Sequence, residues 1–494
     1  MKKYTLTILT LLLFTFCLSA QTPIGSDLVG DTDDDQFGNA VSISADGSRI
    51  AVGAPLFLNG DADIVGYVKV FDLVNGEWEQ VGSTVFGSGP SDFFGNALEL
   101  SADGNVLAIN GIANTNAPIP GQVVVYEWSG TDWVQKGSTI LGKNNGDQFG
   151  QYLALSADGN HLIAGAVQND DAGDAAGQAR VYAFENGDWT QRGADLNGKE
   201  AGDFFGIAVD ISNDGNRIAI GASNAASNAP FDGEVISYEW INDAWAPMGN
   251  PIAGAMSGDL FGISVALSAD GSRIAAGALN NDGAGELAGH VRVFDFTNGD
   301  WQQVGAEING TQTTGWFGVT VSLSDDGNRL AVGAPLTDVT TENEGAFRVY
   351  DLVNNNWLPL GMSIEGEMTG EWLGYDVVLS ADGNQLIASL RSNPIDGPAR
   401  GKARVYDLSM ATDVSDIAIV PLAIYPNPST DWLYPTIDQP STATITNQQA
   451  QVVKRMVILP GQAIAVQELA AGAYQLVLET KEEILVGRFV KVGY

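Results

Sequence analysis

The stretch FGNAVSISADGSRIAVGAP, residues Phe37 to Pro55, contains two apolar segments separated by an Asp-Gly pair. Valine, isoleucine and other apolar residues dominate both segments, which is typical of short β-strands. Asp46 and Gly47 are residue types that tight turns favour. The stretch therefore predicts a β-hairpin.

The same pattern returns six more times along the chain. Each repeat continues through a variable stretch and then through segments such as GYVKVFDLVNGEW and EQVGSTV, so we expect four antiparallel strands per repeat. No segment shows a sustained helical period. Seven repeats of four strands are typical of a β-propeller, with a solenoid as the structural alternative. The glycine of the Phe-Gly or Leu-Gly pair recurs every 55 to 57 residues, at Gly38, Gly95, Gly150, Gly206, Gly262, Gly318 and Gly374.

The two ends of the repeat array favour a closed ring. The fourth strand of six repeats carries a tryptophan, but no such strand follows the seventh ARVYDL segment. The N-terminal PIGSDLVG places Gly25 and Gly30 where the first repeat has Gly82 and Gly87, so it supplies the missing strand. We expect residues 21–408 to form one closed seven-bladed β-propeller, without exposed sheet edges. The tryptophans are Trp78, Trp133, Trp189, Trp245, Trp301 and Trp357.

The N-terminus and the charge of the chain limit its location and partners. Residues 1–20 have the lysines, apolar run and small residues of a secretory signal peptide, and the one cysteine, Cys17, lies within them. No later apolar run reaches the roughly 20 residues that span a bilayer. With 60 acidic and 23 basic residues the net charge is -37, which makes nucleic acid and anionic lipid poor partners. We expect a protein outside the cytoplasm.

The two histidines fall into register positions of the repeat. His161 takes the place of Arg49 and its counterparts, and His290 takes the place of Tyr67. We therefore expect both to be surface residues beside turns. This leaves a catalytic triad or a histidine-rich zinc site little to build on.

The pattern FG...V.LS.DG..IAVGAP, clearest at Phe37–Pro55 and Phe317–Pro335, resembles the FG-GAP repeats of integrin α-subunit propellers and their bacterial relatives. That family places several Asp or Asn residues between the first two strands as a calcium loop, whereas each turn here has one aspartate. One carboxylate cannot supply the six to eight oxygens that calcium takes. We therefore expect hairpin-turn roles for Asp46, Asp103, Asp158, Asp214, Asp270, Asp326 and Asp382.

Candidate binding residues gather where the loops vary most, on the face that carries the connections between the second and third strands. One acid per repeat follows the fourth strand, except at Gly315 in the sixth repeat. These acids could bind a cation or sugar hydroxyls, or could accept hydrogen bonds from their own turns. They are Asp35, Asp92, Asp147, Asp203, Asp259 and Glu371.

Two further groups of carboxylates are candidates. The acids of the long loops could chelate calcium as a cofactor or could be solvated. Glu99, Asp210 and Asp376 interrupt the small and apolar residues of the first strands, and such a set could catalyse glycoside hydrolysis or could simply face a water-filled channel. The long-loop acids are Asp61, Asp63, Asp170, Asp171, Asp174, Asp282 and Glu286.

The repeat pattern stops near Ala411, and after a linker at 409–424 the short alternating segments of residues 425–494 predict a small Ig-like β-sandwich. The YPNPS motif at Tyr425–Ser429 and the closing LAAGAYQLVLETKEEILVGRFVKV resemble the type A C-terminal sorting domain of the type IX secretion system of Bacteroidota. The resemblance implies export across both membranes and contact with that machinery, followed by release or attachment to surface polysaccharide. A plain Ig-like accessory module is the alternative.

Taken together, the sequence predicts a secreted or cell-surface protein that binds a polysaccharide or protein through its long loops, without catalysis. An extracellular carbohydrate-active enzyme using Asp and Glu pairs, and a structural surface component, remain alternatives.

Overall fold

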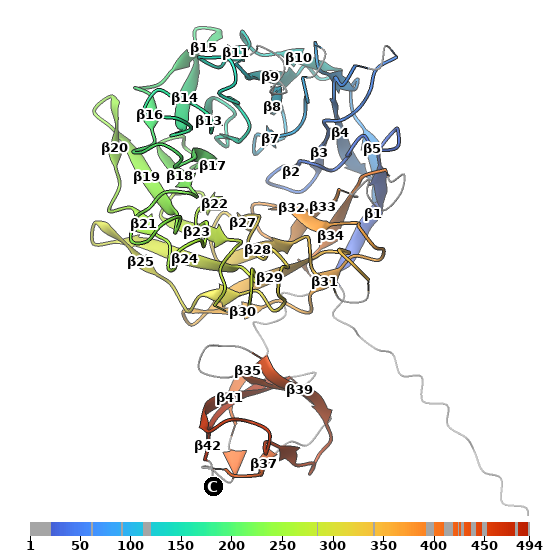
Figure 1. The fold of residues 1–494 in the computed structure, drawn as a ribbon. Coiled ribbons are helices and arrows are strands. Elements are labelled where there is room, and N and C mark those ends of the chain that lie inside the picture. Colours follow the sequence, from blue (N-terminus) through green and yellow to red (C-terminus); the bar gives the residue numbers. More distant parts are fainter. Residues whose placement is uncertain are drawn as a thin grey trace, which may run out of the picture.

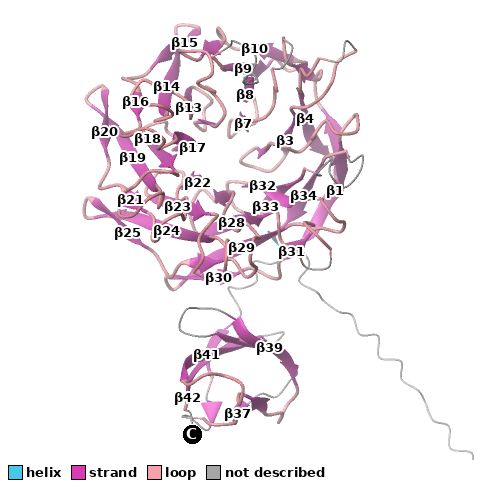
Figure 2. Ribbon diagram, in the orientation of Figure 1, coloured by secondary structure: helices cyan, strands magenta, loops and turns pink. Residues whose placement is uncertain are grey.

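The computed structural model describes residues 21–492 apart from 61–62, 90–91, 112–119, 284, 339–340, 392–399, 410–417, 423, 426–428, 436–440, 447–451 and 480–482. The expected signal peptide and Asp61 thus lie outside the described residues. Within these ranges the chain is all β and has no α-helix (Figure 2). Accordingly, no helix of the described part has the length and apolarity needed to cross a membrane.

Seven antiparallel sheets follow one another along the chain and are arranged in a ring (Figure 1). In sheet 1 the strand order from the centre outwards is β2 (Val41–Ile43), β3 (Arg49–Ala54), β4 (Tyr67–Val74) and β5 (Glu77–Gln80). A fifth strand, β6 (Val85–Phe86), also pairs with β4. The sequence pattern does not predict this strand, because two residues are too few to show an alternation.

Sheets 2 to 6 repeat this arrangement. Sheet 2 consists of β7 (Leu98–Leu100), β8 (Val106–Gly111), β9 (Gln122–Trp128), β10 (Trp133–Gln135) and β11 (Ile140–Leu141). Sheet 3 consists of β12 (Leu153–Leu155), β13 (His161–Ala166), β14 (Gln178–Glu185), β15 (Asp188–Gln191) and β16 (Leu196–Asn197). Sheet 4 consists of β17 (Phe205–Ile211), β18 (Arg217–Ala222), β19 (Glu234–Ile241), β20 (Ala244–Pro247) and β21 (Ile252–Ala253). Sheet 5 consists of β22 (Ser264–Leu267), β23 (Arg273–Ala278), β24 (His290–Thr297), β25 (Asp300–Gln303) and β26 (Ile308–Asn309). Sheet 6 consists of β27 (Val321–Leu323), β28 (Arg329–Ala334), β29 (Ala346–Val353), β30 (Asn356–Pro359) and β31 (Ile364–Glu365).

Sheet 7 combines the two ends of the repeat array. Its strands are β32 (Leu373–Leu379), β33 (Gln385–Leu390), β34 (Lys402–Asp407) and, on the outside, β1 (Thr22–Val29). The β1 strand runs antiparallel to β34, and the Asp27 carboxylate binds the Arg404 guanidinium at 2.6 Å. The innermost strand β32 also contacts β2. All seven sheets share a path of four antiparallel strands, which is consistent with propeller blades whose first and last members meet.

Tryptophan and arginine side chains join neighbouring sheets. The indole N–H of Trp189 donates to the Lys136 carbonyl oxygen of the preceding sheet at 2.9 Å, and the other tryptophans of this register position donate in the same way. Arg49 donates to Asp72 in its own sheet at 2.6 Å and to the Gly104 carbonyl oxygen of the next at 3.0 Å. These contacts explain why both residue types recur in the sequence.

Glycines allow the sheets to approach closely near the axis. A Cβ added at Gly221 would lie 1.9 Å from the carbonyl oxygen of Gly262 in the next sheet. Only glycine fits such a contact between backbones. The Gly-Ala and Phe-Gly segments of successive repeats therefore pack on one another.

The Asp-Gly turns are built as the sequence predicts. Asp46 accepts hydrogen bonds from the Ser44 hydroxyl at 2.8 Å and from the Ser48 N–H at 2.9 Å. The equivalent aspartates accept the same pair of bonds. Their expected role as hairpin-turn residues is confirmed.

The C-terminal part forms two further sheets. One has the order β35 (Ala418–Pro421), β42 (Glu483–Lys491), β41 (Gly472–Glu479), β38 (Ser441–Thr446) and β39 (Val452–Ile458), and the other β36 (Ile424–Tyr425), β37 (Trp432–Pro435) and β40 (Ile464–Ala465). Residues of both sheets share one buried core, for example Leu433 with Leu476. Residues 418–421 belong to the expected linker, yet β35 pairs in parallel with β42. Four residues are too short a segment to separate strand from linker by pattern.

Candidate functional site on the long-loop face

The loops between the second and third strands of each sheet lie on the same side of the ring as the connections that enter the next innermost strand. This follows because neighbouring strands of each sheet are antiparallel. We call this side the long-loop face. Most of the site residues predicted from the sequence lie on it.

The acids that precede the innermost strands are all buried, and they bind backbone. Each accepts a hydrogen bond from the N–H three residues earlier; Asp203 accepts from Glu200 at 2.9 Å and Glu371 from Met368 at 3.1 Å. This is the second of the two roles that the sequence left open. Their binding of an external ligand stays a prediction. The set comprises Asp35, Asp92, Asp147, Asp203, Asp259 and Glu371.

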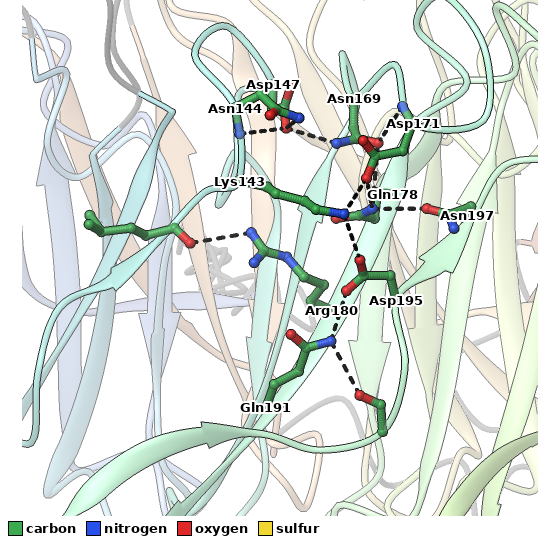
Figure 3. A network of polar contacts seen from close by, with 12 residues as sticks. Lys143, Asn144, Asp147, Asn169, Asp171, Gln178, Arg180, Gln191, Asp195 and Asn197 are labelled. Carbon is green, nitrogen blue, oxygen red and sulfur yellow. Dashed lines mark hydrogen bonds and ion pairs between the residues drawn. The ribbon is translucent and has the colours of Figure 1, made fainter.

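In sheets 1 and 7, a residue at the start of the third strand supports the acid. The Tyr67 hydroxyl donates to Asp35 at 2.9 Å, and the Lys402 ammonium lies 3.3 Å from a Glu371 carboxylate oxygen. In sheet 3 the support passes through the Asn169 amide, which donates to Asp147 at 2.8 Å (Figure 3).

The long-loop acids of sheet 3 take part in the same network. The Lys143 ammonium pairs with Asp171 at 2.6 Å and with Asp195 at 3.2 Å, and the Gln178 amide donates to Asp171 at 3.1 Å (Figure 3). The Lys143 hydrogen bond is the largest cause that lowers the pKa of Asp171. The Lys143 ammonium thus lies beside Asp171, which the sequence suggested as a calcium ligand.

Other loop acids close their own turns. The carboxylates of Asp170 and Asp282 each accept the N–H five residues later, at 2.8 Å and 2.7 Å. Across the described residues, no three His, Cys, Asp or Glu side chains are placed to hold a metal ion together. The structure therefore does not assemble Asp63, Asp170, Asp171, Asp174, Asp282 and Glu286 into a ligand set, and Asp61 lies outside the described residues.

A collar of seven residues, one per sheet, directly precedes the Phe or Leu of the Phe-Gly or Leu-Gly pairs, at the entry to the innermost strands. All seven have φ between 46° and 57°, a left-handed conformation that is uncommon for bulky residues. All are half-buried, and five are large and apolar although glycine would adopt this conformation without strain. Sequence reasoning misses the collar because its conformation recurs while its residue type does not. The collar comprises Gln36, Phe93, Gln148, Phe204, Leu260, Trp316 and Trp372.

Aromatic and cationic groups meet where sheets 7 and 1 join. Trp372 stacks on Tyr375 with ring centroids 6.2 Å apart. The Arg391 guanidinium lies 4.3 Å from the Tyr375 ring centroid and donates to the Gln36 side-chain oxygen at 3.0 Å. The collar thus offers aromatic surface beside hydrogen-bonding groups, which is the composition of many ligand sites.

The three carboxylates of the innermost strands influence one another near the axis. Burial raises the pKa of Glu99 to about 8, and the charges of Asp210 and Asp376 add to this rise. Burial likewise raises the pKa values of Asp210 and Asp376 to about 6.

All three carboxylates also accept a hydrogen bond from an adjacent sheet. Asp210 accepts the Leu267 N–H of the next sheet at 2.6 Å, and Asp376 accepts the Val41 N–H at 3.0 Å. Glu99 accepts the Ser42 hydroxyl at 3.2 Å. Glu99, Asp210 and Asp376 therefore have a structural role, because their hydrogen bonds link neighbouring sheets.

The surface position expected for His290 is wrong, whereas His161 lies beside its turn and is partly exposed. His290 is fully buried, and burial, helped by the Arg292 charge, lowers its pKa to about 3. His161 is half-buried between sheets, because a Cβ at Gly215 would lie 2.5 Å from its ring. The position of a histidine within the repeat does not show how closely side chains of neighbouring segments pack against it, and this packing determines how far it is buried.

Comparison with known proteins identifies the C-terminal part. Residues 423–492 match the family described as the secretion system C-terminal sorting domain. This match supports export through type IX secretion to the cell surface or the medium. No FG-GAP family match was found, and no curated protein matches the chain.

Solved structures of low similarity were also found. A "putative 6-phosphogluconolactonase" from Bacteroides uniformis ATCC 8492 is 13% identical with a TM-score of 0.48, covering 67% of this chain and 86% of that chain. The structure of U3-55K is 13% identical with a TM-score of 0.47, covering 78% and 100%. At these scores neither likeness bears on function.

Proposed function

We propose that this chain is an exported binding protein in which a closed seven-bladed FG-GAP-like propeller recognises a polysaccharide through its long-loop face. The collar is the observation that carries the proposal. Five of the seven collar positions carry large apolar side chains in a left-handed backbone conformation and leave them partly exposed, and strained residues of this kind cluster at binding sites.

The chemistry of the collar suits sugars. Aromatic rings such as Trp316 and Trp372 can lie against the apolar faces of pyranose rings, and neighbouring polar groups can bind hydroxyls. A protein ligand would be expected to engage the longer loops around the collar instead. The sorting domain at 423–492 supports a location where extracellular polysaccharide is present.

The test is retention on immobilised polysaccharides of residues 21–494 and of collar variants. We expect Trp316→Ala and Trp372→Ala each to weaken binding of the retained polysaccharide at least about fivefold, because truncation of central aromatic contacts costs more than about 1 kcal/mol. Val134→Ala, an exposed change on β10, is the control. Equal retention of all variants would contradict a role for the collar.

The innermost carboxylates favour a second candidate, a glycan-active enzyme. A protonated Glu99 beside Asp210 and Asp376 provides an acid together with potential carboxylate bases. Release of reducing ends that is lost in Glu99→Gln would favour this candidate over binding alone.

A further inference from the structure

Sheet 6 differs from the other sheets at one place on the long-loop face. Where they have a buried acid, sheet 6 has Gly315, and where sheets 1 and 7 have the supporting Tyr67 and Lys402, it has Ala346. Both side chains that fill this place elsewhere are absent. A pocket of about 120 Å³ lies there, lined among others by Gly315 and Ala346.

The backbone of the pocket retains the donors that bind a carboxylate in the other sheets. In all six of those sheets, the N–H three residues before the acid donates to its carboxylate. In three of them the N–H four residues before it donates as well. The corresponding groups here are the N–H groups of Gln312 and Thr311, and neither donates a hydrogen bond to another described residue. Both residues line the pocket.

The side chains of the pocket suit an acidic sugar. Arg348 lines the pocket and has no carboxylate of the described part of the chain within ion-pair distance, although its charge acts on Glu365. Thr337 and Ser363 provide hydroxyls, and Glu365 can form a hydrogen bond with a sugar hydroxyl. Burial and the Glu344 charge raise the pKa of Glu365, which reduces its repulsion of a bound carboxylate. The pocket thus contains a guanidinium and two backbone N–H groups that could bind one carboxylate. It also contains side chains that could form hydrogen bonds with sugar hydroxyls.

We infer that the sheet 6 pocket binds the carboxylate of a uronic-acid unit, placed where the other sheets carry their own acid. This assignment rests on the proposed function, because it identifies the bound polymer as an acidic polysaccharide. The net charge of -37 opposes such a ligand at long range, so binding depends on the local donors and should weaken only modestly with added salt.

The repeat itself supplies the test variant. Gly315 is not at positive φ, and its added Cβ would meet Thr337 Oγ1 at 3.3 Å and the Gln312 carbonyl oxygen at 3.5 Å. Gly315→Asp should therefore fit with small adjustments and place the repeat's own carboxylate in the pocket. Gly60→Asp adds the same charge to an exposed loop position that has no neighbour within 4 Å, so it is the matched control.

The probes are D-glucuronate and D-galacturonate, with D-glucose and D-galactose as neutral counterparts, measured by saturation-transfer NMR at constant ionic strength on residues 21–494. We expect at least tenfold stronger binding of a uronate than of its neutral counterpart. The preference for the uronate should vanish in Gly315→Asp and persist in Gly60→Asp. Without ligand, Gly315→Asp should also melt at a higher temperature than the wild type.

Equal uronate binding by wild type and Gly315→Asp would overturn the inference, and so would a wild type that binds neither uronate or that binds uronates no better than the neutral sugars. Retention on polysaccharide columns separates this outcome from the proposed function. Retention without a uronate site would refute only the pocket, whereas a uronate site without retention of any polysaccharide would refute the polymer-binding function and leave the carboxylate site standing.

Discussion

Glu99 shows how an innermost side chain couples charge to stability. Its pKa lies near 8 because burial and two neighbouring carboxylates disfavour the charged form. The folded state therefore holds this proton more tightly than the unfolded chain does. Its contribution to stability is fully present below the ordinary carboxyl pKa and is lost as the pH rises through about 8.

Replacing Glu99 by glutamine should remove this pH dependence. We expect the wild-type melting temperature to fall between pH 5 and pH 9, and Glu99→Gln to reduce that fall by about 2 to 5 °C. Calorimetry across this range measures the difference. Glu79→Gln, at an exposed position of β5, should leave the profile unchanged, and a wild-type slope in Glu99→Gln would refute the assignment.

Individual residues are also where sequence prediction reaches its limit. The role of Asp46 follows from its own turn, so a local pattern suffices to predict it. The burial of His290 and the pocket beside Gly315 depend on the volumes of side chains from other segments, and a register of repeats does not contain those volumes. The left-handed conformation of Trp316 is likewise invisible in its residue type.

At the level of elements, the repeat pattern predicts four strands of every sheet because each has several alternating or β-branched residues. The two-residue strands such as β6 escape it. The closing strand β1 is predictable because Gly25 has a counterpart at Gly82, and both adopt positive φ. Pairing of β1 with β34 matches that expectation.

Deleting residues 21–30 should destabilise the ring. It removes the β1 ladder, the buried Leu28 and the acceptor of the Trp78 indole N–H. We expect a melting temperature lower by at least about 5 °C, measured by calorimetry.

A milder variant separates loss of the strand from loss of folding. Leu28→Ala keeps β1 and should lower the melting temperature by a smaller amount. An unchanged melting temperature after the deletion would show that β1 does not stabilise the ring.

At the scale of the whole molecule, both the net charge and the sorting domain favour a ligand outside the cell. With 60 acidic and 23 basic residues, the chain is expected to repel polyanions such as nucleic acid. The sorting domain at 423–492 directs it outside the cell. Binding by the long-loop face then requires a ligand of the cell exterior, for which polysaccharide is our proposal.

The most direct measurement incubates residues 21–494 with a panel of neutral and acidic polysaccharides and scores retention and released reducing ends in the same samples. Our account predicts retention of at least one polysaccharide without release of reducing ends. Release that disappears in Glu99→Gln, or no retention of any polysaccharide, would contradict it.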